Sequence, residues 1–239
     1  MSARELSQAF YEVVINWEED MEVITAINER ASIRGFNEEP VSREVIEQLL
    51  DAARKAPSAS NQQPWNFVVV TGEIKEKLGE DILSAHKNLS KHYDPSKGKT
   101  IPRSYMDRTK RLLKGMRPYI EKMGKHAVPF IEEGSCVFYG APVLILVTMD
   151  KALPQSKLVD IGCAVENLIL TAQDKGLGTC VIALILMFED LIRERLKISD
   201  SKNIVVGIAL GYPDKDLSVN AFRAPKDELS EMTRWIGFD

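Results

Sequence analysis

The sequence is poor in the residues that most often build disulfide frameworks, metal sites and nucleophilic active sites. Only three cysteines and three histidines occur among its 239 residues. The cysteines are too few and too widely spaced for a disulfide framework or a zinc site. We expect small buried apolar groups at Cys136, Cys163 and Cys180. Cys180 also stays open as a nucleophile, an alternative that we disfavour because no histidine lies on an adjacent predicted element.

Motifs for several common enzyme classes are also absent. The chain contains no P-loop, no HExxH and no GxSxG pattern. The glycines at 176–180 (GLGTC) follow a predicted helix instead of a strand and lack the third glycine of a dinucleotide fingerprint. The three histidines show no ligand spacing, so we expect surface positions for His86, His92 and His126.

Long hydrophobic runs are missing as well. Unbroken apolar runs such as 181–188 are far shorter than the roughly 20 residues of a membrane span. The N-terminal segment lacks the basic region, apolar run and cleavage site of a signal peptide. Apolar residues make up 44% and charged residues 28%, which is typical of a globular protein. We therefore expect a cytoplasmic protein without a membrane partner, folded as a single domain over residues 1–239.

Positive charge is concentrated in one stretch, although the net charge is −4. Residues 86–126 hold twelve Lys or Arg against three acidic residues. This basic stretch lacks interleaved aromatics and any nucleic-acid module, so we expect no nucleic-acid partner. Two alternatives stay open: a solvated helical surface, or a basic wall beside an anionic ligand.

The hydrophobic pattern predicts helices separated by strands that are apolar throughout. Helical spacing recurs at 4–30, 43–56, 73–86, 106–116 and 156–175, with Ser42 as an N-cap. Buried strands are expected at 67–71, 142–148 and 204–210. Strands of this kind predict an α/β or α+β sandwich whose sheet is covered on both faces.

Two segments have the composition of a ligand site. Arg30, Ser32 and Arg34 alternate along a chain that leaves a helix, so in extended backbone they face one side and can converge on an anion. A solvent-exposed helix exit explains the same residues. Residues 56–67 (APSASNQQPWNF) combine small residues, amides and hydroxyls, which suit a polar heteroaromatic ligand with a ribityl chain. An ordinary, rather long connecting loop is the alternative.

Together these segments resemble the RxSxR and APSxxNxQPW motifs of the FMN-dependent nitroreductase family. The stretches 160–180 (DIGCAVENLILTAQDKGLGTC) and 211–235 (GYPDKDLSVNAFRAPKDELSEMTRW) are similar to its core helix and its C-terminal arginine segment. The resemblance runs from about 22 to 235 and is strongest to the subgroup that reduces nitroaromatics such as nitrobenzoates. It implies an α+β fold with a central, mostly antiparallel sheet flanked by helices, and a helical lid around 86–135.

The resemblance also implies how one subunit holds FMN. Arg30 and Ser32, with Ala31 between them, would bind the phosphate together with Arg223. Arg34 would lie at the pyrimidine edge of the ring, near N1 and O2, where its charge would stabilise the reduced flavin. No side chain matches confidently the group that pairs with the O4/N3 edge.

Further residues are implied on the other side of the flavin. The family binds FMN at a homodimer interface, so Pro57, Ser58 and Asn61 would come from the partner subunit. The turn at Ile182 and Ala183 would bring a backbone N–H near flavin N5. The chain departs from the family here, because 181–186 (VIALIL) lacks the usual glycine or glutamate with a nearby aromatic.

The implied activity is hydride transfer from NADH or NADPH to flavin N5 and on to an electron-poor small molecule, a nitroaromatic or a quinone, in a ping-pong cycle. No acid–base side chain is required, since the cofactor carries the chemistry. The basic stretch would favour carboxylated acceptors or the NADPH 2′-phosphate. The alternatives are a flavin-dependent dehalogenase, a flavin-cleaving enzyme, and a flavin-binding protein without turnover.

Overall fold

The computed structural model describes residues 21–89 and 98–238 of the chain. Most of the helix predicted at 4–30 lies outside these residues, and its described end is α2 (Val23–Glu29). The prediction of an unbroken helix is wrong at residues 21 and 22, which are not helical. Met21 N instead donates a hydrogen bond to Asp174 Oδ1 at 2.7 Å, so a tertiary contact replaces a helical one.

Four strands form one antiparallel sheet in the order β1-β2-β4-β3. They are β1 (Asn66–Thr71), β2 (Val143–Asp150), β3 (Gly178–Ile182) and β4 (Lys202–Gly211). The expected α+β fold with an antiparallel sheet is confirmed, and β1, β2 and β4 are the three predicted strands. The expected burial of β1 is wrong: it is an edge strand of the described sheet, and Val69 is 39% exposed.

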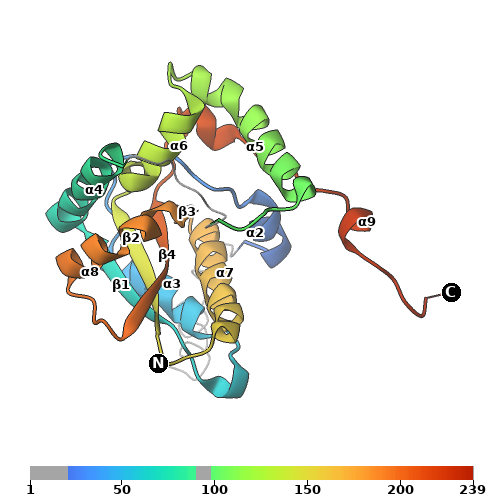
Figure 1. The fold of residues 1–239 in the computed structure, drawn as a ribbon, viewed down its shortest axis with the longest axis horizontal. Coiled ribbons are helices and arrows are strands. Elements are labelled where there is room, and N and C mark those ends of the chain that lie inside the picture. Colours follow the sequence, from blue (N-terminus) through green and yellow to red (C-terminus); the bar gives the residue numbers. More distant parts are fainter. Residues whose placement is uncertain (1–20, 90–97, 239) are drawn as a thin grey trace, which may run out of the picture.

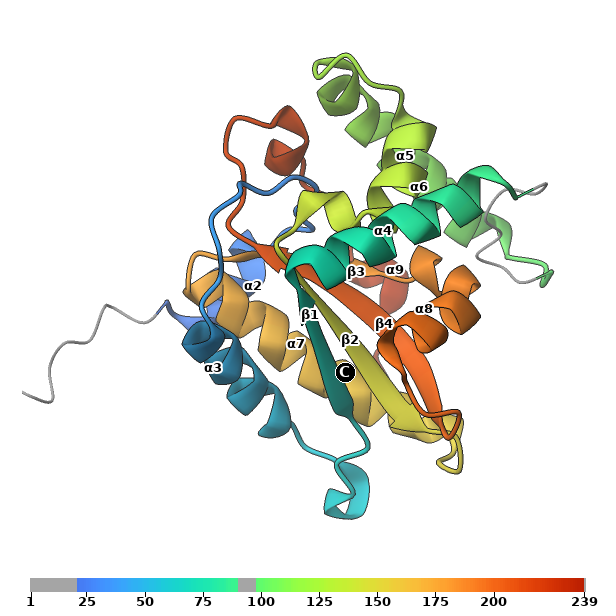
Figure 2. The same ribbon diagram turned by 90° about the vertical axis from the view of Figure 1, so that its left-hand side faces the viewer.

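Helices cover both faces of the sheet, as Figure 2 shows. Helices α3 (Arg43–Arg54) and α7 (Leu158–Asp174) pack on the face that carries Ile145 and Val147. Helices α4 (Gly72–Lys87) and α8 (Glu189–Leu196) pack on the opposite face, which carries Leu144 and Leu146. Because both faces of β2 are buried, the strand is apolar at every position from 143 to 147, which made it predictable.

Two helix ends follow their predicted signals. Helix α3 begins after Ser42, whose side chain accepts a hydrogen bond from Val45 N at 3.3 Å. Helix α7 ends at Asp174, and Gly176 adopts the left-handed conformation (φ +69°) that turns the chain into β3.

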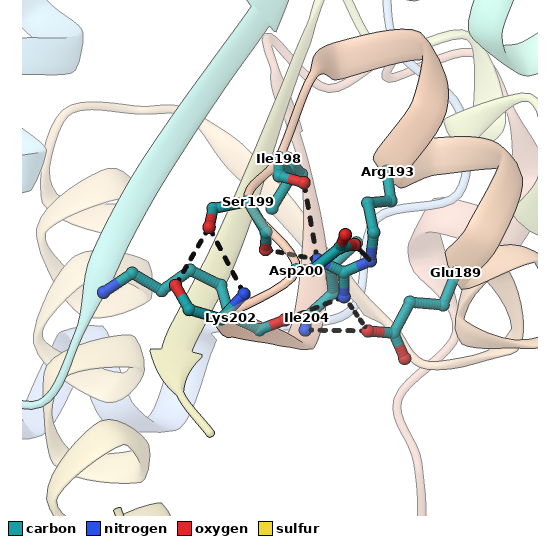
Figure 3. A network of polar contacts seen from close by, with 8 residues as sticks. Glu189, Arg193, Ile198, Ser199, Asp200, Lys202 and Ile204 are labelled. Atoms are coloured by element: carbon teal, nitrogen blue, oxygen red, sulfur yellow. Dashed lines mark hydrogen bonds and ion pairs between the residues drawn. The ribbon is translucent and has the colours of Figure 1, made fainter. Parts of the chain in front are cut away.

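The connection between α8 and β4 is held by one arginine (Figure 3). The Arg193 guanidinium donates to the carbonyl oxygens of Ser199 and Lys202, at 2.5 and 2.7 Å, and pairs with Glu189. The Glu189 carboxylate in turn accepts a hydrogen bond from Ile204 N at 3.4 Å. This network fixes the turn that leads from α8 into β4. On the other side of α8, the short 3-10 helix η4 (Leu184–Phe188) connects it to β3.

Two further helices, α5 (Arg103–Glu121) and α6 (Ala127–Cys136), stand beyond the end of the sheet (Figure 1). Helix α5 is longer than the predicted 106–116. A small core joins the pair to the C-terminal segment that contains η5 (Ser218–Ala221), and its buried residues are Met116, Ile120, Val219 and Phe222. After the short helix α9 (Leu229–Met232) the chain projects away from the body (Figure 1). Within the described ranges, every helix is too short or too polar to span a bilayer.

Candidate functional site

The segment after α2 runs beside β3 as a short extension of the sheet. Ser32 forms a parallel bridge with Thr179, and Ile33 N donates to Thr179 O at 2.9 Å. The Ile33 side chain fills the space beside Gly178, where an added Cβ would lie 2.6 Å from Ile33 Cγ1. The buried Ile33 thus alternates with the more accessible Ser32 and Arg34, as the predicted extended backbone requires.

One buried amide, which the sequence did not single out, ties this segment to the C-terminal part of the chain. Asn220 Oδ1 accepts a hydrogen bond from Arg34 N at 2.8 Å. Asn220 Nδ2 donates to the carbonyl oxygens of Gly35 and Asp214, both at 2.8 Å. Asn220 therefore fixes the backbone on both sides of the Arg34 Cα.

The Arg34 side chain borders a cavity of about 560 Å³ between this segment and helix α6. Its Nη1 donates to the Ser32 carbonyl oxygen at 3.2 Å, and its Cζ lies 5.9 Å from the centre of the Tyr139 ring. Arg34 Nε is buried and has no hydrogen-bond partner among the described residues. A half-buried cation with a buried, unused donor is suited to an anionic or carbonyl-rich ligand.

A second cavity, of about 700 Å³, lies on the other side of the same segment. Ala31, Ile33, Lys215 and Arg223 line it. Arg223 Nη1 donates to the carbonyl oxygens of Asn220 and Phe222, at 2.9 and 3.2 Å. Of the residues predicted at the phosphate, Ala31 and Arg223 line this cavity, together with the acidic Glu29 and Asp214. Arg30 and Ser32 are not among the lining residues, and Arg30 is half-buried at the end of α2.

The polar loop of residues 56–65 is anchored to the first turns of α7. Lys157 Nζ donates to Ala59 O at 3.2 Å, and Ala59 N donates to Asp160 Oδ2 at 3.3 Å. Lys157 and Asp160 are both buried, and Lys157 Nζ lies 3.5 Å from Asp160 Oδ2. Each side chain therefore compensates the charge of the other. Neither residue was predicted as part of the site, since their roles depend on contacts across about 100 positions of sequence.

Within the loop, Ser58 Oγ accepts a hydrogen bond from Gln63 N at 3.0 Å. Ser60, Asn61 and Gln63 adopt positive φ, which turns the loop outward and leaves Pro57 and Asn61 exposed. Pro57 and Asn61 are therefore accessible to a partner, whereas Ser58 is half-buried and its hydroxyl is engaged within the loop.

The two predicted parts of the site lie at opposite ends of α7 (Figure 2). Asp160, in the first turn, holds the loop of residues 56–65, whereas Asp174, the last residue of the helix, bonds Met21 just before α2. Fourteen residues of helix separate these two anchors, which corresponds to about 21 Å. The two sets of predicted residues are thus anchored at opposite ends of one helix.

The turn after β3 explains the aliphatic run that departs from the family pattern. Leu184 and Ile185 are buried in the core under α4 and α8, so their apolar character serves packing. Val181 and Ala183 remain exposed beside them, and Leu186 N donates to Ala183 O at 3.1 Å. The turn at Ile182 and Ala183 thus leaves a small accessible surface at the end of β3.

The cysteines and histidines fit the expectations only in part. Burial raises the pKa of the Cys180 thiol, which disfavours a nucleophilic thiolate, and Cys163 is only half-buried. The surface prediction is wrong for His86: its side chain is 11% exposed and lies between α4 and α6, with Nε2 3.4 Å from Glu132 Oε2. His126 is exposed, and His92 lies outside the described residues.

Part of the basic stretch is occupied by an internal ion pair. Arg108 and Arg111 on α5 both bind the carboxylate of Asp227, and they hold the pKa of that carboxyl below its ordinary value. Lys125 and His126, by contrast, border the Arg34 cavity, where Glu133 lies as well. Arg108 and Arg111 therefore bind the C-terminal segment, whereas Lys125 and His126 face the cavity.

Comparison with known proteins agrees with this geometry. The family model described as the nitroreductase family matches residues 27–212. A 4-nitrobenzoate reductase of Pseudomonas putida is 34% identical over 224 residues, covering 92% of this chain and 97% of the relative. The FMN-dependent nitroreductase NfnB of Mycobacterium smegmatis, solved in complex with NADPH, superposes with a TM-score of 0.77 at 25% identity, covering 88% and 96% of the two chains. An FMN- and NADPH-dependent NfnB of Sphigopyxis sp. strain HMH has the same fold, with a TM-score of 0.83 at 24% identity over 91% of this chain and 100% of the other. The chain belongs to the nitroreductase family.

Proposed function

We propose that this protein is an FMN-dependent nitroreductase that takes electrons from NADH or NADPH. The observation that carries the proposal is the half-buried Arg34, whose Nε is buried and unpaired among the described residues and which borders a cavity of about 560 Å³. FMN, when bound, supplies hydride transfer between NAD(P)H and an electron-poor acceptor, a nitroaromatic compound or a quinone. The named relatives, a nitrobenzoate reductase and an FMN-dependent nitroreductase, support this assignment.

The residues fit FMN by their chemistry. Arg30, Ser32 and Arg223, with the backbone of Ala31, would hold the phosphate, because guanidinium groups and hydroxyls make charge-assisted hydrogen bonds to it. Arg34 would place its charge beside the pyrimidine ring, where it stabilises the negative charge of the reduced form. The exposed turn at 182–183 would face the reacting edge of the ring.

We further propose that the site is completed by a second copy of the chain, which supplies Pro57, Ser58 and Asn61. The length of α7 supports this, because Asp160 and Asp174, which anchor the two parts of the site, lie about 21 Å apart along the helix. Exposed apolar side chains also support a homodimer, since monomers rarely leave so many uncovered. They lie on α2, α7 and the C-terminal segment: Val23, Ile24, Val159, Leu229, Met232, Trp235, Ile236 and Phe238.

Mixing two inactive variants tests the shared site. In Arg30→Ala and Asn61→Ala homodimers, every flavin site carries a defect. After random exchange of subunits, half of the dimers are mixed, and one site of each mixed dimer has both native sets, so about a quarter of FMN binding should return. If mixing restores nothing while the native protein binds FMN, both sets serve the same protomer and the shared site is wrong.

The activity is tested by anaerobic stopped-flow mixing with NADH and NADPH, followed by a panel of nitroaromatic and quinone acceptors. We expect rapid bleaching near 450 nm, roughly the flavin maximum, and parallel double-reciprocal plots, because donor and acceptor use one site in turn. A protein that binds FMN without bleaching would be a flavin-binding protein without turnover. Release of halide or cleavage of the flavin would identify the other two alternatives.

Helices α5 and α6 with the preceding residues, around 86–135, would form a lid on this single-domain protein, and Lys125 would attract a carboxylated acceptor or the NADPH 2′-phosphate. Lys125→Gln should raise KM for NADPH or 4-nitrobenzoate and leave KM for neutral nitrobenzene unchanged. Equal effects on charged and neutral substrates would contradict this role. We also propose a cytoplasmic location, which the three free thiols support.

A further inference from the structure

Tyr139 occupies a conformation that bulky side chains rarely adopt. It follows α6 at the turn into β2, where Phe138, Tyr139 and Gly140 have φ values of 55°, 54° and 76°. Two consecutive aromatic residues in the left-handed region are unfavourable unless the surroundings impose it, and such strain concentrates at functional sites. The turn points the Tyr139 ring back toward α6 and the Arg34 cavity.

Helix α6 fixes the position of this ring. The Tyr139 hydroxyl donates to Ile131 O at 3.2 Å and lies 3.0 Å from Ser135 Oγ, which itself donates to Ile131 O at 2.7 Å. The ring packs flat against Gly134, where an added Cβ would approach Tyr139 Cε1 to 2.6 Å. Both the hydroxyl and the ring are therefore held by one turn of α6.

The opposite contact of the ring is the Arg34 guanidinium, 5.9 Å from the ring centre and within cation–π range. The guanidinium also donates to the Ser32 carbonyl, two residues away in sequence, which limits its direction only weakly. A side-chain hydrogen bond to the Tyr139 hydroxyl adds to the contact with the ring. Burial raises the pKa of the Tyr139 hydroxyl although the Arg34 cation lowers it, so the ring stays a neutral phenol. The uncharged Tyr139 ring therefore attracts the Arg34 guanidinium and leaves its positive charge available to a ligand.

We infer that Tyr139 is a positioning residue that directs the Arg34 guanidinium toward FMN and makes this direction depend on the docking of α6. The inference rests on the proposed function, in which Arg34 contacts the pyrimidine ring. Through the successive contacts of Ile131, Ser135, Tyr139 and Arg34, α6 then contributes to the affinity for FMN and to the midpoint potential of the bound flavin.

The test compares Tyr139→Leu, Tyr139→Phe and Ser135→Ala with the native holoenzyme, by FMN titration and by the midpoint potential of the bound flavin. Tyr139→Leu removes the ring and should weaken FMN binding about tenfold, with a lower midpoint potential, because a misdirected cation stabilises the reduced form less. Tyr139→Phe and Ser135→Ala keep the ring and should shift both quantities in the same direction by less. If Tyr139→Leu fails to fold, the shifts in FMN affinity and midpoint potential of these two variants decide the test.

Tyr119→Leu is the matched control, because this tyrosine of α5 packs on Phe222 and has no part in the contact with Arg34. It should leave the midpoint potential unchanged. The deciding measurement is a double-mutant cycle: in an Arg34→Ala background, Tyr139→Leu should have no further effect on the potential.

The outcomes separate the two proposals. A native protein that binds no FMN overturns both of them. If FMN binds and Arg34→Ala lowers the potential, but Tyr139→Leu has no effect or an additive one, the proposed function survives and the role of Tyr139 is wrong.

Discussion

The sheet and the α5–α6 pair are held in place by different means. The sheet lies between two large apolar clusters, and β2 is buried on both faces. The α5–α6 pair has a core of only four buried residues, shared with the C-terminal segment, and ion pairs to Asp227 that remain accessible to solvent. The C-terminal end of α6 also joins the cluster under α4 through Cys136. Because local opening costs less where fewer apolar contacts are broken, the α5–α6 pair should open while the sheet stays intact. The region beside the cavity is thus the more adaptable one.

The largest effect should follow from a cavity in the sheet core. Leu168 on α7 is fully buried against the sheet. Leu168→Ala should lower the free energy of unfolding by about 2–5 kcal/mol, measured by urea denaturation, because transfer and cavity terms add. A loss below about 1 kcal/mol would mean that this core is no more tightly packed than the α5–α6 pair.

A smaller and more local effect is expected at the base of α5. Phe222 packs against Tyr119 and belongs to the small core. Phe222→Ala should cost about 1–3 kcal/mol, with much faster hydrogen exchange in α5 and α6 and unchanged exchange in β2 and β4. Equal acceleration in the sheet would show that the two regions open together.

The junction between the two regions carries a pH-dependent contribution. Burial raises the pKa of Cys136, the last residue of α6, to about 12 from an ordinary value of 9.0. Above pH 9 the unfolded chain loses this proton before the folded one does, so stability falls from pH 9 toward pH 12, by about 1 kcal/mol at pH 10. Thermal unfolding of Cys136→Ala should show a shallower decline over this range. If stability falls equally steeply with pH in Cys136→Ala and in the native protein, the decline comes from other groups, such as Cys180 and Tyr139.

The smallest effect is expected for the accessible ion pairs. Asp227→Asn should reduce stability only slightly, and the difference from the native protein should vanish at high salt, because exposed pairs are screened. Salt titration of the thermal midpoint of both proteins measures this. A large, salt-independent loss would mean that Asp227 holds α5 by more than charge.

Local signals account for the parts of the fold that were predicted. Strands β2 and β4 were predictable because they lie in the middle of the sheet and are apolar. The start of α3 was predictable because the Ser42 side chain caps the helix by accepting a hydrogen bond from Val45 N. Strand β3 was missed, because its five residues begin with Gly178, just after Gly176, and include the exposed Val181. An edge strand of this length does not show a period-2 pattern.

The site was predicted as a set of motifs, but the residues that orient those motifs were not. Asn220 reaches Arg34 across 186 positions, and Lys157 reaches Ala59 across 98. A single buried amide or lysine has no local pattern that reveals its distant partner. Tyr139 was missed because its proposed role depends on the left-handed turn at residues 138–140. Two neighbouring aromatic residues in a sequence do not predict such a turn.

The length of α7 has a consequence for how the holoenzyme would respond to concentration. When each cofactor is held by residues from both ends of α7, one from each copy, binding of FMN and association of subunits become a single linked equilibrium. Dilution would then release flavin, and added FMN would draw protomers together. Fluorescence of free flavin, followed as the protein is diluted, would report the dissociation of the subunits themselves.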